Sequence, residues 1–222
     1  MTRRSMGMGM SMTGAATAAL LLAGCATMPS NVAVATEAPS EGAAAPGSWR
    51  ATATVQDRAR IRGWYAAWQD ALTDARAKGF GAQIANEGAL LSPEAALPNP
   101  HLPPGEYRCR TIKLGGQARA PGYTVYDWFA CRVTAEQGIV SLTKGSGSQR
   151  PVGLVFPDTM RRQIFLGTLV LGDEMVPLDY GADKLRDMAG LIERIGERRW
   201  RLVLPHPAFE SLLDVIELVP EE

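Results

Sequence analysis

Short stretches in which apolar and polar residues alternate fill the second half of the chain. Glycine, proline and aspartate residues separate them at similar intervals. Near the C-terminus, Trp200, Leu202 and Leu204 alternate with Arg199, Arg201 and Val203, as expected for a half-buried strand. The predicted strands cover residues 106–114, 123–133, 138–144, 152–156, 163–171, 188–195, 199–204 and 212–219.

Helical spacing replaces this alternation in the residues before the strands. Thr54 and Asp57 fit a capping box at the start of a helix, and Gly79 marks its expected end. Two tryptophans share the apolar face of this helix, and we expect them to pack it against the rest of the domain; ligand stacking is the alternative. The residues at helical spacing are Ile61, Trp64, Tyr65, Trp68, Leu72 and Ala75.

These patterns together predict an α+β fold. A second short helix is expected over residues 82–91, and prolines punctuate a connector over residues 98–104. The N-terminal helical segment, residues 49–104, is expected to pack on the β-domain of residues 105–222. About eight short strands at regular spacing indicate that this β-domain is antiparallel and is either barrel-like or a sandwich.

The first residues have the character of an export signal. Arg3 and Arg4 precede an apolar stretch of small residues that is too short to span about 30 Å of hydrocarbon. The stretch ends in Leu-Leu-Ala-Gly before Cys25, which resembles the lipobox of bacterial lipoproteins. That resemblance implies removal of residues 1–24 and acylation of Cys25; an ordinary secretory signal with a coincidental cysteine is the alternative.

Residues 25–48 are rich in alanine, proline, serine and glutamate and lack apolar periodicity, so we expect a flexible tether. The lipid membrane would then be a partner through acylated Cys25, with the domain facing the periplasm. Ala26 in place of an aspartate favours the outer membrane over the inner one, by resemblance to enterobacterial sorting rules.

Lipidation of Cys25 leaves Cys109 and Cys131, which we expect to form a disulfide in an oxidising periplasm. Two buried free thiols are the alternative. If the two cysteines lie opposite each other in a hairpin, Lys113 lies opposite Asp127, a favourable cross-strand pair. The bridge should stabilise the fold by roughly 3 kcal/mol.

Composition narrows the classes of function. The 222 residues are 46% hydrophobic, enough for one core, and the 23 basic residues balance the 23 acidic ones. This balance argues against a nucleic-acid partner. The two histidines, His101 and His206, lie in proline-flanked segments without ligand spacing, so we expect no metal and no cofactor.

Two further sequences are candidates for chemistry. Ser141 and Lys144 match the S-x-x-K spelling of penicillin-recognising enzymes, but residues three apart in a strand point to opposite faces, so we expect a coincidence. In the glycine-serine loop that comes next, Ser148, Gln149 and Arg150 are candidate ligand-binding residues, because Arg150 can clamp a carboxylate or phosphate. The alternative is a loop arginine that pairs with a neighbouring acid.

Several segments resemble an uncharacterised family of Gram-negative lipoproteins, catalogued as domain of unknown function 4893. They cover residues 64–68, 87–91, 105–110, 147–151, 165–168, 193–196, 199–203 and 210–218. This resemblance implies a location in the cell envelope and no biochemical activity. A small secreted barrel with one disulfide is also similar to bacterial metalloprotease inhibitors of lipocalin-like fold, from which the helical N-terminal third departs.

The sequence shows no catalytic constellation, and we name no catalytic residue. We therefore expect a non-enzymatic envelope module that binds a protein or a small apolar ligand. The first alternative is a structural or assembly lipoprotein without a ligand. The second is an enzyme with a cleft near Arg150 and Asp173, where titratable groups would be strongly shifted.

Overall fold

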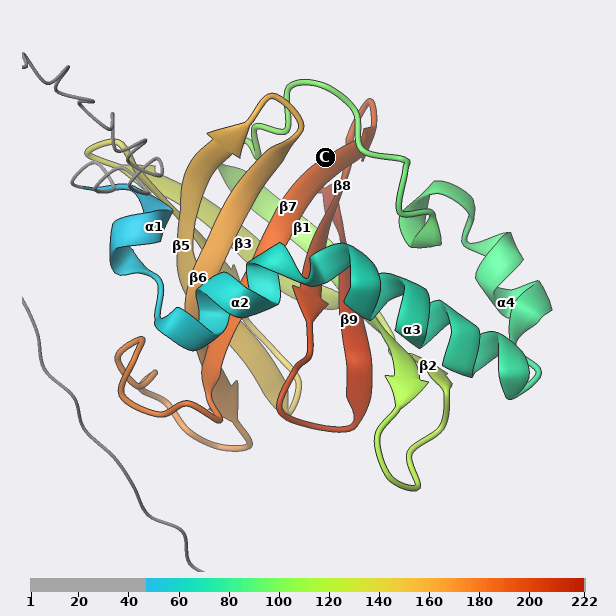
Figure 1. Cartoon of the computed structure of the whole chain (residues 1–222). Helices are drawn as coiled ribbons and strands as arrows, with labels where there is room; N and C mark the ends of the chain where they lie inside the picture. The colour runs from blue at the N-terminus through green and yellow to red at the C-terminus, as the bar shows by residue number, and fades with distance from the viewer. Residues whose placement is uncertain (1–46, 222) are drawn as a thin grey trace, which may run out of the picture. The chain divides into compact units, whose positions relative to one another are not determined.

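The computed structural model describes residues 47–221, which hold five short helices and nine strands (Figure 1). The predicted signal of residues 1–24, Cys25 and nearly all of the predicted tether lie outside the described residues. The helices are α1 (Trp49–Thr52), α2 (Val55–Arg62), α3 (Trp64–Ala77), α4 (Gly81–Asn86) and the 3₁₀ helix η1 (Gly88–Leu91). The strands are β1 (Gly105–Gly116), β2 (Tyr123–Val125), β3 (Phe129–Glu136), β4 (Ile139–Lys144), β5 (Gln149–Thr159), β6 (Arg162–Leu171), β7 (Asp187–Gly196), β8 (Arg199–Pro205) and β9 (Ser211–Pro220).

The predicted first helix is present, but in two pieces. The hydroxyl of Thr54 accepts a hydrogen bond from the backbone N–H of Asp57 at 3.1 Å, so the expected cap is confirmed. Gly63 then separates α2 from α3, and α3 ends before Gly79. No pattern in the sequence indicated α1, a single turn capped by Ser48.

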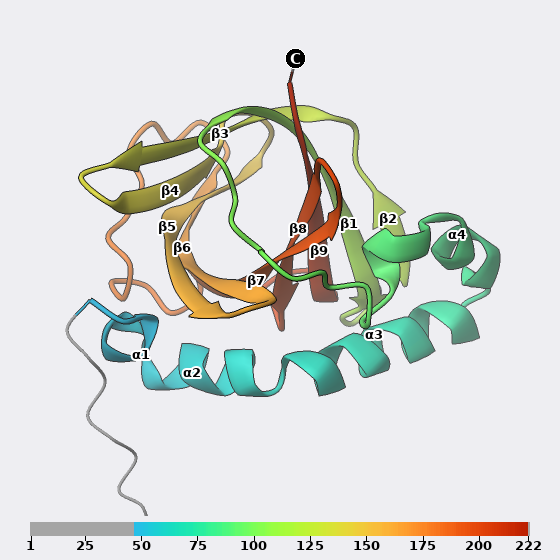
Figure 2. The ribbon, with the colours of Figure 1, turned by 90° about the horizontal axis from the view of Figure 1, so that it is seen from above.

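The strands form a closed antiparallel barrel. Each strand pairs with its neighbour along the chain from β3 to β9, β1 pairs with β3, and β9 returns to pair with β1. Eight strands therefore close the ring, and β2 is an extra short strand on the edge of β1 (Figure 2). The structure decides between the two expected architectures in favour of the barrel. All eight predicted strands are present; the predicted strand 123–133 is divided into β2 and β3.

The expected disulfide between Cys109 and Cys131 is present, with the two Cα atoms 5.9 Å apart. The expected register is wrong by two residues, because Cys109 lies opposite Phe129 and Cys131 lies opposite Tyr107. The bridge joins diagonal positions on the inner face of the barrel. Residues 126–128 leave the sheet between β2 and β3, so a single uninterrupted hairpin register does not exist.

The error in register also removes the expected partner of Lys113. This residue lies opposite Thr124 on β2 and opposite Asp214 on β9, and the predicted Lys113–Asp127 pair is not formed. The lysine does have an aspartate across from it, but the aspartate comes from the strand that closes the barrel.

Large side chains fill the middle of the barrel. The ring of Phe165 lies over the paired backbones of Gly153 and Gly167, where an added Cβ at either glycine would lie 2.8 Å from the ring carbon Cζ. Phe165, Ile192 and Leu202 have no exposed surface. The interior therefore resembles a packed protein core.

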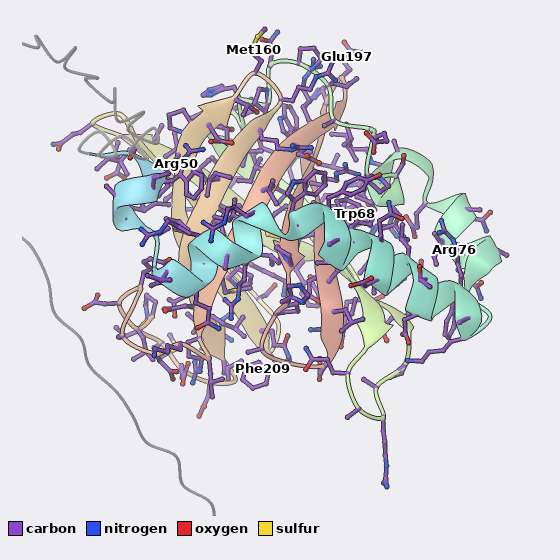
Figure 3. The ribbon with its side chains drawn as sticks, viewed as in Figure 1. Arg50, Trp68, Arg76, Met160, Glu197 and Phe209 are labelled. Carbon is purple, nitrogen blue, oxygen red and sulfur yellow. A yellow bond between two sulfur atoms is a disulfide. The ribbon has the colours of Figure 1, made fainter. Side chains whose placement is uncertain are left out.

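One end of the barrel is closed by the connector that precedes β1. Leu102 is fully buried among the interior side chains. Its backbone N–H donates to Gln163 Oε1 at 3.0 Å, Trp200 Nε1 donates to the carbonyl of His101 at 3.0 Å, and the Tyr107 hydroxyl donates to the carbonyl of Pro103 at 2.7 Å. Met160 and Glu197 mark this plugged end in Figure 3, and Phe209 marks the opposite, open end.

The helices α2 and α3 cross the outer face of the barrel over β7, β8, β9 and β1 (Figure 2). They bury an outward-facing arginine, which the alternation in β8 predicted to be in solvent. Arg201 has no exposed surface; it binds Glu193 Oε2 at 2.6 Å and donates to the carbonyls of Ala89, Leu90 and Ser92. Its guanidinium lies 4.4 Å from the ring centre of buried Trp68, so the tryptophan packs the helix onto the barrel.

Candidate functional site

Polar side chains line the open end of the barrel, in contrast to its apolar middle. A cavity of about 40 Å³ lies among Lys113, Gln149 and Asp214, under the loops that carry Leu185 and Phe209. A second hollow of about 90 Å³ adjoins it and shares Lys113 and Gln149. A single buried water needs roughly 10–15 Å³ of such space. Together the two hollows have room for several waters or one small ligand.

The second hollow has a mixed lining. Its walls are Thr111, Lys113, Tyr126, Phe129, Lys144, Ser148, Gln149 and Glu210. Strands β1, β4 and β5 contribute most of the charged and amide groups, and the loop before β9 contributes Glu210. The two hollows share Thr111, Lys113 and Gln149, and together they are called the open-end site.

Lys113 occupies an inward position of β1 and is held by three oxygens. Its ammonium lies 3.1 Å from Gln149 Oε1, 3.2 Å from Asp214 Oδ2 and 3.2 Å from Glu210 Oε2. Burial lowers the pKa of Lys113, but the carboxylates of Asp214 and Glu210 outweigh burial and raise it above its ordinary value. Lys113 is therefore a permanent cation near neutral pH.

Asp214 completes this pair from β9 and is almost wholly buried. Burial raises the pKa of Asp214, whereas Lys113 and the hydroxyl of Ser211, which donates to Oδ1, act in the opposite direction. The raised pKa of Asp214 favours the neutral acid, whereas the raised pKa of Lys113 favours the charged ammonium, so the two shifts differ on whether the pair is ionised. We take the ionised pair as the state at neutral pH, because both oxygens of the carboxylate have a donor.

Lys144 ends β4 and differs from Lys113 in its partners. Its ammonium donates to the backbone carbonyls of Ser146 at 2.6 Å and Gln149 at 3.1 Å, and it lies 3.7 Å from the ring centre of Phe129. Within residues 47–221, no carboxylate forms an ion pair with it. Desolvation by burial, and then the nearby Arg150 charge, lower the pKa of Lys144 to about 8.

The turn between β4 and β5 is shaped around this amine. Gly147 has a φ of +90°, and a Cβ built on it would lie only 2.7 Å from Lys144 Nζ. A side chain at this position would therefore strain the backbone and displace the ammonium. This fit explains why a glycine lies at the middle of the Gly-Ser-Gly-Ser sequence.

The structure divides the three residues that the sequence grouped as a ligand site. Ser148 and Gln149 line the open-end site. Arg150 lies in β5 and points to the outer face, where it donates to the carbonyls of Gly147, Gly172 and Glu174 at 2.8, 2.5 and 2.6 Å. Arg150 is not among the residues that line the open-end site, and it lines a separate hollow with Lys144 and Ser146. It faces away from Gln149 because consecutive strand residues face opposite sides of a sheet. It also binds carbonyls and not the acid that the alternative proposed.

Sequence reasoning missed both lysines of the open-end site. Lys113 was expected only as the cross-strand partner of Asp127, and Lys144 only as part of the coincidental S-x-x-K spelling. The signal was in the alternation itself, since Lys113 continues the inward series of Tyr107 and Cys109, and Lys144 continues that of Leu142. A lysine at an inward position of a barrel strand should therefore be considered a candidate binding-site residue and not a surface residue.

The remaining candidates contribute no site. Ser141 bonds to Thr134 at 2.8 Å on the outer face of β4, whereas Lys144 lies inside, so the S-x-x-K spelling is a coincidence as expected. Among the described residues, no group of three or more His, Cys, Asp or Glu side chains could hold a metal ion. Between residues 47 and 221, no helix has the length and apolar character that a membrane crossing requires.

Comparison with known proteins places the chain in a family. No curated protein and no solved structure matches it. The sequence profile of the family described as a domain of unknown function, DUF4893, matches residues 49–218, from α1 to near the end of β9. Because this match covers well over half of the chain, the chain belongs to the DUF4893 family.

Proposed function

We propose that this chain is an envelope lipoprotein, anchored through acylated Cys25 and facing the periplasm, whose barrel binds a small carboxylate at the open-end site. The binding role is proposed to be non-enzymatic. The observation that carries it is that two buried ammonium groups, those of Lys113 and Lys144, line one hollow, and that Lys144 has only neutral acceptors around it. A buried cation without a counter-ion is unfavourable, so an anion that reaches it gains a strong charge-assisted hydrogen bond.

The chain's own Glu210 supports the choice of a carboxylate. This side chain is 50% exposed, yet its Oε2 lies 3.2 Å from the Lys113 ammonium and it lines the same hollow as Lys144. Its carboxylate therefore occupies a place where a ligand carboxylate could bind. Glu210 has a φ of +68°, an unusual conformation for a residue with a side chain, in the loop that forms the rim. Rotation of this side chain into solvent would open the site.

The volume of the site supports a small ligand over a large apolar one. The hollows of about 40 and 90 Å³ are much smaller than the 300–1,000 Å³ typical of pockets for drug-sized molecules. The middle of the barrel is occupied by Phe165 and its neighbours. A short monocarboxylate with a carbon skeleton of a few atoms fits these dimensions and meets the Phe129 ring with its apolar part.

Titration of the full chain in detergent with acetate and propionate tests the binding role. We expect saturable NMR shifts of residues 144–150, with affinities of roughly millimolar for ligands this small. Glu210→Gln should bind acetate more tightly, because it removes the competing charge, whereas Asp70→Asn on exposed α3 should bind as the parent does. A response that survives unchanged in Lys144→Met, or a response that never saturates, would overturn the binding proposal.

The proposed membrane anchoring through Cys25 has a separate test. Mass spectrometry of the chain purified from a bacterial envelope should show an N-terminus at Cys25 carrying acyl chains. Cys25→Ser should block acylation and release from the signal. An unmodified chain that retains residues 1–24 would contradict the lipoprotein proposal without touching the barrel site.

An assembly role without a ligand is the second candidate, and exposed apolar side chains favour it. Met175 and Val176 in the loop between β6 and β7 are 91% and 78% exposed. Contiguous exposed apolar surface favours a protein contact, and these two residues are adjacent in the chain. If Met175→Ser/Val176→Thr loses a partner that co-purifies from envelopes, while acetate has no effect on any variant, the assembly role replaces the binding role.

A further inference from the structure

The chain uses lysine sparingly, and the open-end site holds half of its lysines. The sequence contains 19 arginines and only four lysines: Lys78, Lys113, Lys144 and Lys184. Arginine makes most of the ion pairs in the described structure, including the buried pair of Arg201 with Glu193. Arginine stays protonated in proteins, whereas a buried lysine can lose its proton and become a nucleophile. The two inward lysines therefore permit a chemistry that the other cations of this chain do not.

We propose that the Lys144 amine condenses reversibly with the carbonyl carbon of a small α-keto acid or aldehyde acid and forms an imine, while Lys113 binds the carboxylate of that ligand. This inference rests on the proposed binding of a carboxylate at the same site. It adds the ligand class, a carbonyl group next to a carboxylate, and a covalent role for one named atom, Lys144 Nζ.

The surroundings of Lys144 are suited to the neutral amine. A neutral amine has two N–H hydrogens, and the two carbonyls of Ser146 and Gln149 accept two hydrogen bonds. Its lone pair then has no partner in the described part of the protein. Burial and the positive charge of Arg150 both favour loss of the third proton near pH 8, whereas the Phe129 ring acts in the other direction.

Lys113 has the opposite character and suits the second role. Its ammonium is bound by two carboxylates and stays charged, so it is a poor nucleophile and a good anchor for an anion. Gln149 joins the two lysines, because its side-chain oxygen accepts from Lys113 and its backbone oxygen accepts from Lys144. A ligand carboxylate would displace Glu210 from Lys113 and leave Asp214 in place.

The proposed step balances without an added oxidant or reductant. The lone pair of Lys144 Nζ forms a bond to the carbonyl carbon, and the carbon–oxygen double bond breaks. The oxygen leaves as water after it takes up the two protons that the neutral amine loses. The hydroxyls of Tyr126 and Ser148 line the same hollow and can relay these protons.

Borohydride trapping tests the proposal on the full chain in detergent. The protein is mixed with pyruvate at pH 8, reduced, digested, and examined by mass spectrometry for the carboxyethyl adduct on each lysine. An ordinary lysine amine with a pKa near 10.4 is less than about 1% neutral at this pH. We therefore expect at least roughly tenfold more adduct on Lys144 than on exposed Lys184 in the same sample. Equal labelling of the two lysines, or none on Lys144, would overturn the imine.

Two controls separate this proposal from the one on which it rests. Acetate has no carbonyl that can condense, so it should protect Lys144 from pyruvate if the two ligands share the site. Lys144→Arg keeps the charge and cannot form the imine, so it should lose the adduct, whereas Lys184→Arg at an exposed position should leave both acetate binding and the adduct on Lys144 unchanged. If acetate binds but pyruvate leaves no adduct on Lys144, only the imine fails. If acetate neither binds nor protects, the binding function fails as well.

Discussion

The two ends of the barrel are built from the same strands and differ in almost every physical respect. At the plugged end, the connector lays the fully buried Leu102 on the interior and is held by hydrogen bonds from Tyr107 and Trp200. At the open end, the inward positions carry Lys113 and Lys144, and the loops leave small hollows between them. One barrel thus separates the part that stabilises the fold from the part that is free for chemistry.

The change from apolar to polar inward side chains occurs within single strands. Along β1 the inward residues run from Tyr107 and Cys109 to Thr111 and Lys113. The apolar half contacts the disulfide and the connector, whereas the polar half meets Asp214 of the closing strand. A buried ion pair of this type contributes little net stability compared with apolar packing. Its presence at the open end is therefore better explained by a role in binding.

Replacing each inward lysine with methionine should separate the two amines of the open end most clearly. Lys113→Met leaves Asp214 buried without its cation, and we expect a loss of about 3–5 kcal/mol in the free energy of unfolding at pH 7. Lys144→Met removes a cation that has no acidic partner, so we expect little loss or a gain in stability. Urea unfolding of both variants measures the difference.

Acidification provides a control for the Lys113 variant. Burial raises the pKa of Asp214, and removal of Lys113 takes away a cation that lowers it, so the acid is protonated at a higher pH in the variant. The loss of stability should therefore shrink as the pH falls. Equal losses for both lysine variants, independent of pH, would mean that the two amines act alike and that the paired and unpaired lysines do not differ in role.

The plugged end should depend on the packing of one side chain. Leu102→Ala is expected to lower the free energy of unfolding by about 2–5 kcal/mol, because it leaves a cavity among residues that cannot close it. Leu185→Ala, at the rim of the open end, is the matched control; Leu185 is 62% exposed, and the expected change is within about 0.5 kcal/mol. Similar effects at both positions would show that the connector is not the plug.

The disulfide belongs to the apolar half and should matter for stability more than for binding. Reduction, or replacement of Cys109 and Cys131 by alanine, should lower stability by about 3 kcal/mol, since the bridge closes a loop with a sequence separation of 22 residues. Acetate binding at the open end should persist under conditions in which the reduced chain remains folded. Thermal unfolding with and without a reductant measures the first effect, and loss of binding in a folded, reduced chain would contradict the second.

The sequence predicted the barrel better than the site, and the reason lies in what alternation encodes. All eight predicted strands are present because apolar residues at every second position report a buried face directly. The same rule misplaced Arg201, since the pattern describes a strand and not the helix that covers its other face. The register at Cys109 was also beyond reach, because residues 126–128 leave the sheet without a sequence signal.

The open-end site depends on contacts between residues far apart in the chain. Lys113 and Asp214 meet only because β9 closes the barrel against β1, and a sequence separation of 101 residues offers no local clue to that pairing. Ser148 and Gln149 were predicted because their loop is distinctive, and they do line the site. Arg150 was the more obvious ligand residue from its chemistry, yet it points away.

The change in stability with pH that arises from Lys144 should be the smallest of these expected effects. Burial holds the pKa of Lys144 at about 8 in the folded chain, below its ordinary value of 10.5, so between these values the unfolded chain binds more protons than the folded one. Stability must then rise with pH across this window, by roughly 1–2 kcal/mol after allowance for partial solvent screening. Tyr107, Tyr123 and Tyr180 also have a raised pKa, but their contribution begins only near pH 10, where tyrosines of the unfolded chain titrate. The charge of Arg150 adds to the size of this rise because it lowers the pKa of Lys144, whereas Lys113 stays charged throughout because its pKa is raised. Subtracting the curve of Lys144→Met from that of the parent chain between pH 7 and about 9.5 isolates this contribution. A flat difference would show that Lys144 keeps its proton and would remove the physical basis for its reactivity.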